Sequence, residues 1–227
     1  MKPSLQGKKP IRLLPVYSGL FTSILILSNI LAAKIVQIGP FVFDGGTLLF
    51  PLSYIFGDVL TEVYGYRQSR KVIWTGFISL IIMVVAIWSV SILPAEGSWL
   101  LQRAFDSILL QMPRIALASI IGYFVGEYSN AVILSVLKKK TLGNHLLLRT
   151  MVSTLVGQLL DSGLFVIIAF WRIYSTETII TMLFSNYVFK CAIEFLFTPI
   201  TYFVIKITKK FEGCEVFDYD EKYNPLP

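Results

Sequence analysis

The stretch PLSYIFGDVLTEVYGYRQSRK, residues 51–71, is apolar in its first half and basic at its end. The apolar half nevertheless carries Asp58 and Glu62, which are four residues apart. This spacing is about one helical turn, so both carboxylates share one face of one helix. A carboxylate that faces lipid costs at least about 2.5 kcal/mol, so the pair is expected to face a cavity or cationic partners. This stretch is therefore predicted to be functional.

The composition is that of an integral membrane protein. Of the 227 residues, 55% are hydrophobic and only 15% are charged, and the mean hydropathy is +0.70. A soluble domain has about 25% charged residues. The apolar residues also form long runs, which predicts an all-α membrane bundle of about six transmembrane helices. We divide the chain into a basic cytoplasmic N-terminus at 1–12, a six-span domain at 13–207 and an acidic cytoplasmic tail at 208–227.

The six spans are predicted at residues 13–36, 41–62, 71–93, 115–137, 146–171 and 178–207. The second is a broken or re-entrant span, because Asp44, Gly45, Gly46 and Pro51 interrupt it. Its continuous part, residues 48–62, is shorter than the roughly 20 residues that a straight span needs. Irregular backbone at membrane depth requires cover by protein or by a water-filled cavity, and transporters often build substrate sites there.

Residues 94–114 form a different kind of segment. Apolar residues recur at helical spacing, and polar and charged residues lie between them. This pattern predicts an outer amphipathic helix that lies on the membrane. The alternative is an ordinary loop helix packed on the bundle.

The positive charges predict the orientation. Fourteen of the 20 Lys and Arg residues lie at the two chain ends and in the segments after the second and fourth spans, and three lie on the other side. The positive-inside rule then places both termini in the cytoplasm, in a multi-pass protein of the cytoplasmic (inner) membrane. Short basic segments between spans, rather than a basic stripe on a folded surface, also argue against nucleic acid as a partner.

Polar and charged groups occur in every predicted span except the third. Five carboxylates and three cations are among them. They either join the helices by ion pairs and hydrogen bonds, or line a central cavity that binds a polar solute. Interhelical hydrogen bonds average only about 0.6 kcal/mol in membranes, which favours the cavity. The candidate substrate-binding residues are Asn29, Lys34, Asp58, Glu62, Glu127, Arg149, Gln158, Asp161, Asn186, Lys190 and Glu194.

Enzymatic and metal chemistry are not indicated. The G-x-G-D motif of intramembrane aspartyl proteases lacks its first glycine before Asp58, and the single histidine, His145, lies in a loop segment. The sequence contains no G-x-x-x-x-G-K-[ST] phosphate loop. Cys191 and Cys214 have no metal-ligand spacing. We therefore predict no catalytic residue, no metal and no cofactor.

Four blocks of this sequence resemble a known family. They are NILAAK at 29–34, FPLSYIFGDVLTEVYGYRQSRKVIW at 50–74, RTMVSTLVGQLLDSGLF at 149–165 and NYVFKCAIEFLFTP at 186–199. The longest block is similar to the signature of the queuosine precursor transporters, a branch of the vitamin uptake transporter family. The amphipathic segment and the acidic tail carry no such signature.

The resemblance implies uptake of 7-cyano- or 7-aminomethyl-7-deazaguanine, or of queuine. Our first hypothesis is that the chain is a stand-alone permease for such a base. The polar residues are compatible with such a base. A guanine-like base presents a ring N–H beside an amino group, which a carboxylate accepts, and its carbonyl needs a donor such as Gln158, Asn186, Arg149 or Lys190. The expected partners are this base and the lipid bilayer.

A second hypothesis is a substrate-binding subunit of an energy-coupling, ATP-driven importer. Such subunits are also small six-span bundles, and they need partner chains to move their substrate. A stripe of small residues for docking a partner would favour this hypothesis, and Gly122 and Gly126 form one such G-x-x-x-G pair. Homo-oligomerisation and an energy-coupling partner are both left open by the sequence.

Overall fold

The computed structural model describes residues 12–140 and 146–213. The predicted N-terminal segment up to residue 11 and the tail from residue 214 lie outside the described residues. The elements in chain order are α1 (Leu14–Leu31), β1 (Ile35–Ile38), β2 (Phe41–Asp44), a 3-10 helix η1 (Gly45–Leu49), α2 (Phe50–Tyr64), α3 (Tyr66–Ser91), α4 (Gln102–Leu109), α5 (Met112–Lys140), α6 (Leu146–Phe170) and α7 (Thr176–Glu212).

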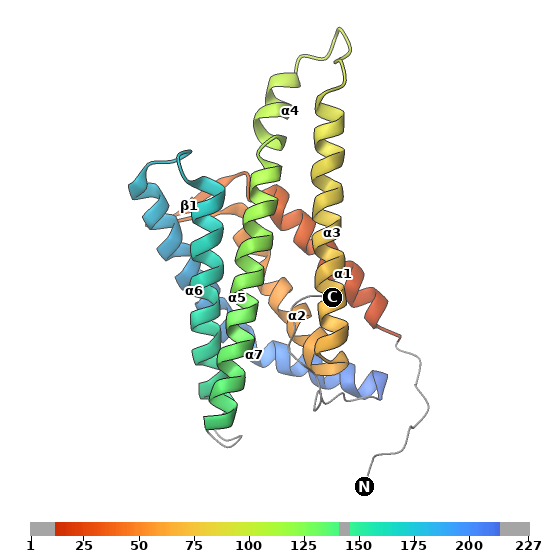
Figure 1. Ribbon diagram of the computed structural model, residues 1–227, viewed down its shortest axis with the longest axis vertical. Coiled ribbons are helices and arrows are strands. Elements are labelled where there is room, and N and C mark those ends of the chain that lie inside the picture. The colour runs from red at the N-terminus through yellow and green to blue at the C-terminus, as the bar shows by residue number, and fades with distance from the viewer. Residues whose placement is uncertain (1–11, 141–145, 214–227) are drawn as a thin grey trace.

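Five helical segments of the described chain are long and apolar enough to cross a membrane. They are Leu14–Leu31, Arg67–Ser91, Gln102–Asn130, Met151–Phe170 and Thr176–Glu212. Figure 1 shows α3, α5 and α6 running roughly along the long axis of the molecule, with α1 and α7 inclined to them. The predicted all-α membrane class is confirmed. Helix α2, with 15 residues, is shorter than a straight span needs, so the sixth, broken crossing stays a prediction.

The chain between α1 and α2 is irregular, as predicted, but it takes a form that the sequence pattern did not indicate. Residues 35–44 form an antiparallel hairpin in which Ile35 pairs with Asp44, and Gly39 takes φ 58° at its turn. The 3-10 helix η1 then packs directly on α1. A Cβ at Gly45 would lie 2.6 Å from the carbonyl oxygen of Leu31, and one at Gly46 would overlap the carbonyl of Ser28. Only glycine permits this approach.

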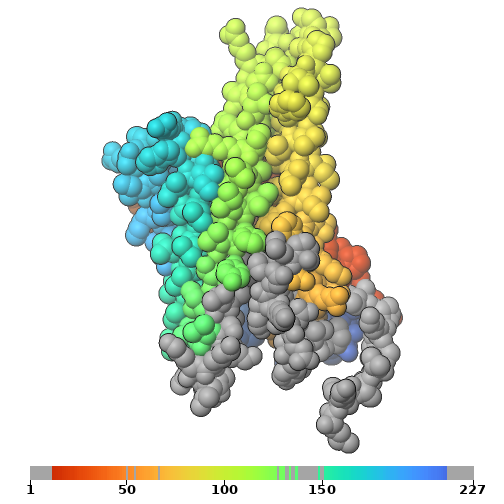
Figure 2. All heavy atoms as spheres, in the orientation of Figure 1, coloured from red at the N-terminus to blue at the C-terminus, as the bar shows by residue number. Residues whose placement is uncertain are grey.

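Two clusters of buried apolar residues hold the helices together. The first joins α1, α2 and α3 through residues such as Phe21, Leu60 and Phe77. The second joins α5, α6 and α7 through residues such as Val166 and Met182. Figure 2 shows the far ends of α3 and of the α4–α5 segment projecting beyond the rest of the bundle.

The predicted amphipathic segment is helical at Gln102–Leu109 and again from Met112, where α5 begins, and none of the residues of α4 is buried. Figure 1 shows α4 continuing upward from α5 beside the end of α3. An open groove of about 350 Å³ lies between the ends of α3 and α4, lined by Val90, Trp99 and Phe105 among others. The side chains that line it are mainly apolar.

Glu212 ties both ends of the described chain together. Its carboxylate accepts the backbone N–H groups of Arg12 at 3.1 Å and Leu13 at 2.6 Å, which belong to the otherwise unpaired amino end of α1. It also accepts the hydroxyl of Tyr64, at the end of α2, at 2.9 Å. Glu212 is 5% exposed, so the last turn of α7 provides a buried cap for α1.

We expect Glu212→Ala to destabilise the fold, because it leaves three donors without their carboxylate. The expected cost is about 1–3 kcal/mol. Thermal unfolding of the protein in detergent measures it, with Glu177→Ala in the exposed first turn of the same helix as the matched control. Equal midpoints for the two variants would contradict a capping role.

Candidate functional site

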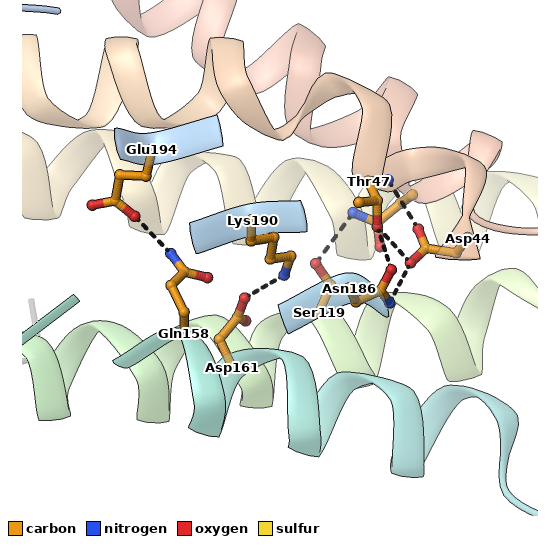
Figure 3. A network of polar contacts seen from close by, with 9 residues as sticks. Asp44, Thr47, Ser119, Gln158, Asp161, Asn186, Lys190 and Glu194 are labelled. Carbon is orange, nitrogen blue, oxygen red and sulfur yellow. Dashed lines mark hydrogen bonds and ion pairs between the residues drawn. The ribbon is translucent and has the colours of Figure 1, made fainter. Parts of the chain in front are cut away.

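A ladder of polar side chains lies between α6 and α7. Asn186, Lys190 and Glu194 follow one face of α7 at steps of four residues. Because α6 and α7 are joined by a short turn, they run antiparallel, and the partners on α6 descend in number as those on α7 rise. Asp161 meets Lys190, and Gln158 meets Glu194 (Figure 3).

The central rung of the ladder is an ion pair. Lys190 Nζ lies 2.6 Å from Asp161 Oδ2, and the two side chains are 1% and 14% exposed. Two charges removed from water to this extent lose most of their hydration, and their mutual attraction offsets that loss only while both are present. Removal of either partner would therefore leave the other without its partner inside the bundle.

The next rung is a carboxylate with neutral donors. Glu194 accepts the Thr154 hydroxyl at 2.8 Å and, through its other oxygen, the Gln158 side-chain N–H at 3.4 Å. The second distance is long for a hydrogen bond. Gln158 is 9% exposed, and its Oε1 has no hydrogen-bond partner within the described part of the structure. Among the described residues, this rung therefore keeps hydrogen-bonding capacity that no protein group uses.

At the other end of the ladder, the hairpin and η1 supply two residues that the sequence prediction missed. Asp44 and Thr47 are 1% and 0% exposed. The Asn186 side-chain N–H donates to Asp44 Oδ2 at 3.1 Å, and the Thr47 backbone N–H donates to Asp44 Oδ1 at 3.1 Å. The Thr47 hydroxyl lies 2.8 Å from Asp44 and 3.1 Å from Asn186 Oδ1. The one available signal was an acidic residue before two glycines in an apolar stretch.

The α5 helix packs closely against α6, behind the ladder, at two glycine residues. A Cβ at Gly126 would lie 2.7 Å from Asp161 Cβ and 2.8 Å from the Gly157 carbonyl oxygen. A Cβ at Gly122 would lie 2.9 Å from the Asp161 carbonyl oxygen. The G-x-x-x-G pair therefore packs α5 against α6 within this chain, directly behind Asp161.

Asn29 extends the polar contacts to α1 and α5. Its side-chain N–H group donates to the Leu25 carbonyl at 2.8 Å and to the Ser119 hydroxyl at 3.3 Å. Asn29 is 3% exposed, and its Oδ1 has no hydrogen-bond partner among the side chains and backbone groups that the structure describes. Lys34, by contrast, is exposed just after α1.

The acidic pair of α2 lies elsewhere. Asp58 and Glu62 are both exposed, so they do share a face, but Glu62 pairs with Lys209 at 2.7 Å near the end of α7. The Glu62 side chain is 58% exposed. The structure therefore does not bring Glu62 into the ladder, because the apolar face of α2, with Val59, Leu60 and Val63, is the one that packs inward. The side chains of Glu127 on α5 and Arg149 on α6 lie outside the described part of the structure.

In residues 12–140 and 146–213, no group of three or more His, Cys, Asp or Glu side chains has a geometry that holds a metal ion. The charged groups of the ladder have hydrogen-bonding partners of the protein's own. The arrangement is suited to binding a polar molecule through hydrogen bonds.

Comparisons with known proteins identify the family of the chain. Residues 44–204, more than two thirds of the chain, match the family model described as "Putative vitamin uptake transporter". The chain is 28% identical over 178 residues to a "Probable queuosine precursor transporter" of Bacillus subtilis, covering 78% of each chain. It is 27% identical over 173 residues to a "Queuosine precursor transporter" of Escherichia coli, covering 75% of this chain and 76% of that one. No solved structure matches the chain.

The matched region begins at Asp44 and ends beyond Pro199, so it contains the hairpin carboxylate, α2 and the complete α6–α7 ladder. The chain therefore belongs to the vitamin uptake transporter family and is a multi-pass membrane transporter rather than an enzyme.

Proposed function

We propose that this transporter imports queuosine precursors, 7-cyano- or 7-aminomethyl-7-deazaguanine or queuine, into the cytoplasm. The relatives that bear this name cover about three quarters of the chain. The single observation that supports a substrate site in this structure is the buried ladder between α6 and α7. Its ion pair and its unused hydrogen-bonding groups lie within a bundle of membrane helices.

In this proposal, the base binds beside the ladder. The residues proposed to contact or surround the base are the buried polar side chains of the ladder and its neighbours. Polar groups buried in a bundle are costly unless a function retains them. The proposed set consists of Asn29, Gln158, Asp161, Asn186, Lys190 and Glu194, together with Asp44 and Thr47.

The proposed location is the cytoplasmic membrane, with both chain ends in the cytoplasm. Glu212 joins the beginning of α1 to the end of α7, so both ends of the described chain lie on one side of the bundle. The chain segments after α2 and at the end of α5, which contain the basic residues of 67–71 and 138–140 in the sequence, lie toward the same end of Figure 1. A concentration of positive charge on one side is typical of the cytoplasmic face.

We propose that one polypeptide suffices for transport. The small-residue stripe that would have favoured docking of an energy-coupling partner, Gly122 and Gly126, is covered by α6 of the same chain. This leaves no observation in favour of the importer-subunit hypothesis.

The test is uptake of labelled 7-aminomethyl-7-deazaguanine by proteoliposomes that contain only this protein. We expect saturable accumulation above that of empty vesicles, and competition by unlabelled 7-cyano-7-deazaguanine. Binding of the base by the purified protein without any uptake would contradict the stand-alone carrier. If the protein neither binds nor takes up the base, the proposed substrate is wrong.

A further inference from the structure

The unused polar atoms beside the ladder are mainly hydrogen-bond acceptors. Among the described residues, buried side-chain atoms without a partner include Oδ1 of Asn130, Oε1 of Gln158 and Oγ of Ser162. The first two are amide oxygens, which can only accept, whereas a hydroxyl both donates and accepts. Ser162 is 0% and Gln158 is 9% exposed.

These atoms and the Glu194 carboxylate belong to one region. Gln158 and Ser162 lie one turn apart on the same face of α6. A Cβ at Gly157, next to Gln158, would lie 2.9 Å from Asn130 Cβ, so α5 brings Asn130 to the same level. Glu194 faces Gln158 from α7.

The Glu194 carboxylate is only partly satisfied by the described residues. A carboxylate offers about four lone-pair positions. In the described structure, Glu194 accepts one hydrogen bond of ordinary length, from Thr154, and one long one, from Gln158. The carboxylate and the neighbouring amide oxygen thus form an acceptor surface, and buried acceptors are stabilised by a ligand that supplies N–H donors.

We propose that Glu194 and Gln158 are the specificity-determining residues of the transporter, and that they bind the donor edge of a guanine-type base. This inference rests on the proposed function and deepens it. The ring N–H and the exocyclic amino group stand side by side on such a base, so together they present several donors to the two acceptors. An adenine-type base places an unprotonated ring nitrogen there, and acceptor would then face acceptor.

The exocyclic amino group is therefore the feature by which the site distinguishes one base from another. A base that lacks it leaves one buried acceptor unpaired, and a site built to hydrogen-bond a substrate group discriminates strongly against the analogue without that group. The Lys190–Asp161 pair, one rung away, holds its charges against each other at 2.6 Å and is not required for this discrimination.

The experiment compares two ligands on one preparation. Equilibrium binding of 7-deazaguanine and of 7-deazahypoxanthine, which lacks the amino group, is measured with the purified full chain in nanodiscs. We expect the wild-type protein to bind 7-deazaguanine about tenfold or more tightly. We expect Glu194→Gln to reduce that preference to about twofold, mainly by weakening the binding of 7-deazaguanine. Because both ligands are measured on the same sample, a change in the folded fraction cancels from the ratio.

The matched control is Glu177→Gln, the same substitution in the exposed first turn of the same helix, which should retain the wild-type ratio. Gln158→Leu, which removes the amide oxygen, should lower the ratio as Glu194→Gln does. An unchanged ratio in Glu194→Gln would overturn the inference, and so would equal loss of both ligands. If the wild-type protein binds neither base, the proposed function fails instead.

Discussion

Replacement of Lys190 by methionine is expected to abolish uptake and to lower the stability of the protein sharply. The substitution removes the ammonium from its 2.6 Å contact with Asp161 and leaves that carboxylate in the bundle without its cation. Breaking a buried ion pair from one side costs about 3–5 kcal/mol. We expect the thermal midpoint in detergent to fall, and uptake by proteoliposomes to decrease more than tenfold relative to the wild type.

The double variant Asp161→Asn/Lys190→Met separates stability from transport. It removes both charges, so most of the lost stability should return. Uptake should stay low, because the proposed site has lost its polar pair. Lys209→Met is the matched control on the same helix: it breaks the exposed pair with Glu62, and surface pairs contribute only about 0–1 kcal/mol. Equal effects of Lys190→Met and Lys209→Met would show that burial does not distinguish the two pairs.

Replacement of Gly126 by alanine is expected to have the second-largest effect. The new Cβ would meet Asp161 Cβ at 2.7 Å and the Gly157 carbonyl oxygen at 2.8 Å, so α5 and α6 must separate. Overpacking of this kind costs about 1–3 kcal/mol. We also expect uptake to fall, because Asp161 is displaced from Lys190.

Gly163→Ala is the control for Gly126→Ala. It makes the same change on α6, where a Cβ would meet no atom within 4 Å. Alanine is the better helix former, so this variant should be as stable as the wild type or slightly more stable. Thermal unfolding and the yield of protein in the membrane fraction measure both variants. A stable, active Gly126→Ala protein would contradict the close packing of the two helices.

The polar faces of α6 and α7 were predicted from spacing alone. Steps of four residues place Asn186, Lys190 and Glu194 in one row, and the polar stripe of α6 follows from the same rule. Their partners were not predictable. Only the antiparallel packing of the two helices assigns Asp161 to Lys190 and Gln158 to Glu194.

For the acidic pair of α2, residue spacing predicted the shared face correctly but not its environment. Four residues place Asp58 and Glu62 on one face, but the spacing does not say what that face meets. Burial of the opposite, apolar face of α2 turns Glu62 outward to Lys209. The prediction that this stretch carries the functional site therefore remains untested for Asp58, and the structure gives Glu62 a surface partner.

Asp44 and Thr47 could not be predicted because their partner is about 140 residues away in the chain. In the sequence, Asp44 and the glycines after it indicate only an interruption of a span. The hairpin and the close contact of Gly45 with α1 place these residues inside the bundle, where they form hydrogen bonds with Asn186.

The sequence by itself determined the membrane class, the helical segments and the rows of polar side chains, because hydropathy and helical periodicity are local properties of the chain. The tertiary structure alone decided which of those rows meet. A buried polar group is stabilised by a specific atom on another element, and no local pattern contains the position of that atom. The pairing of α6 with α7, the entry of Asp44 and the outward turn of Glu62 all depend on how the helices pack.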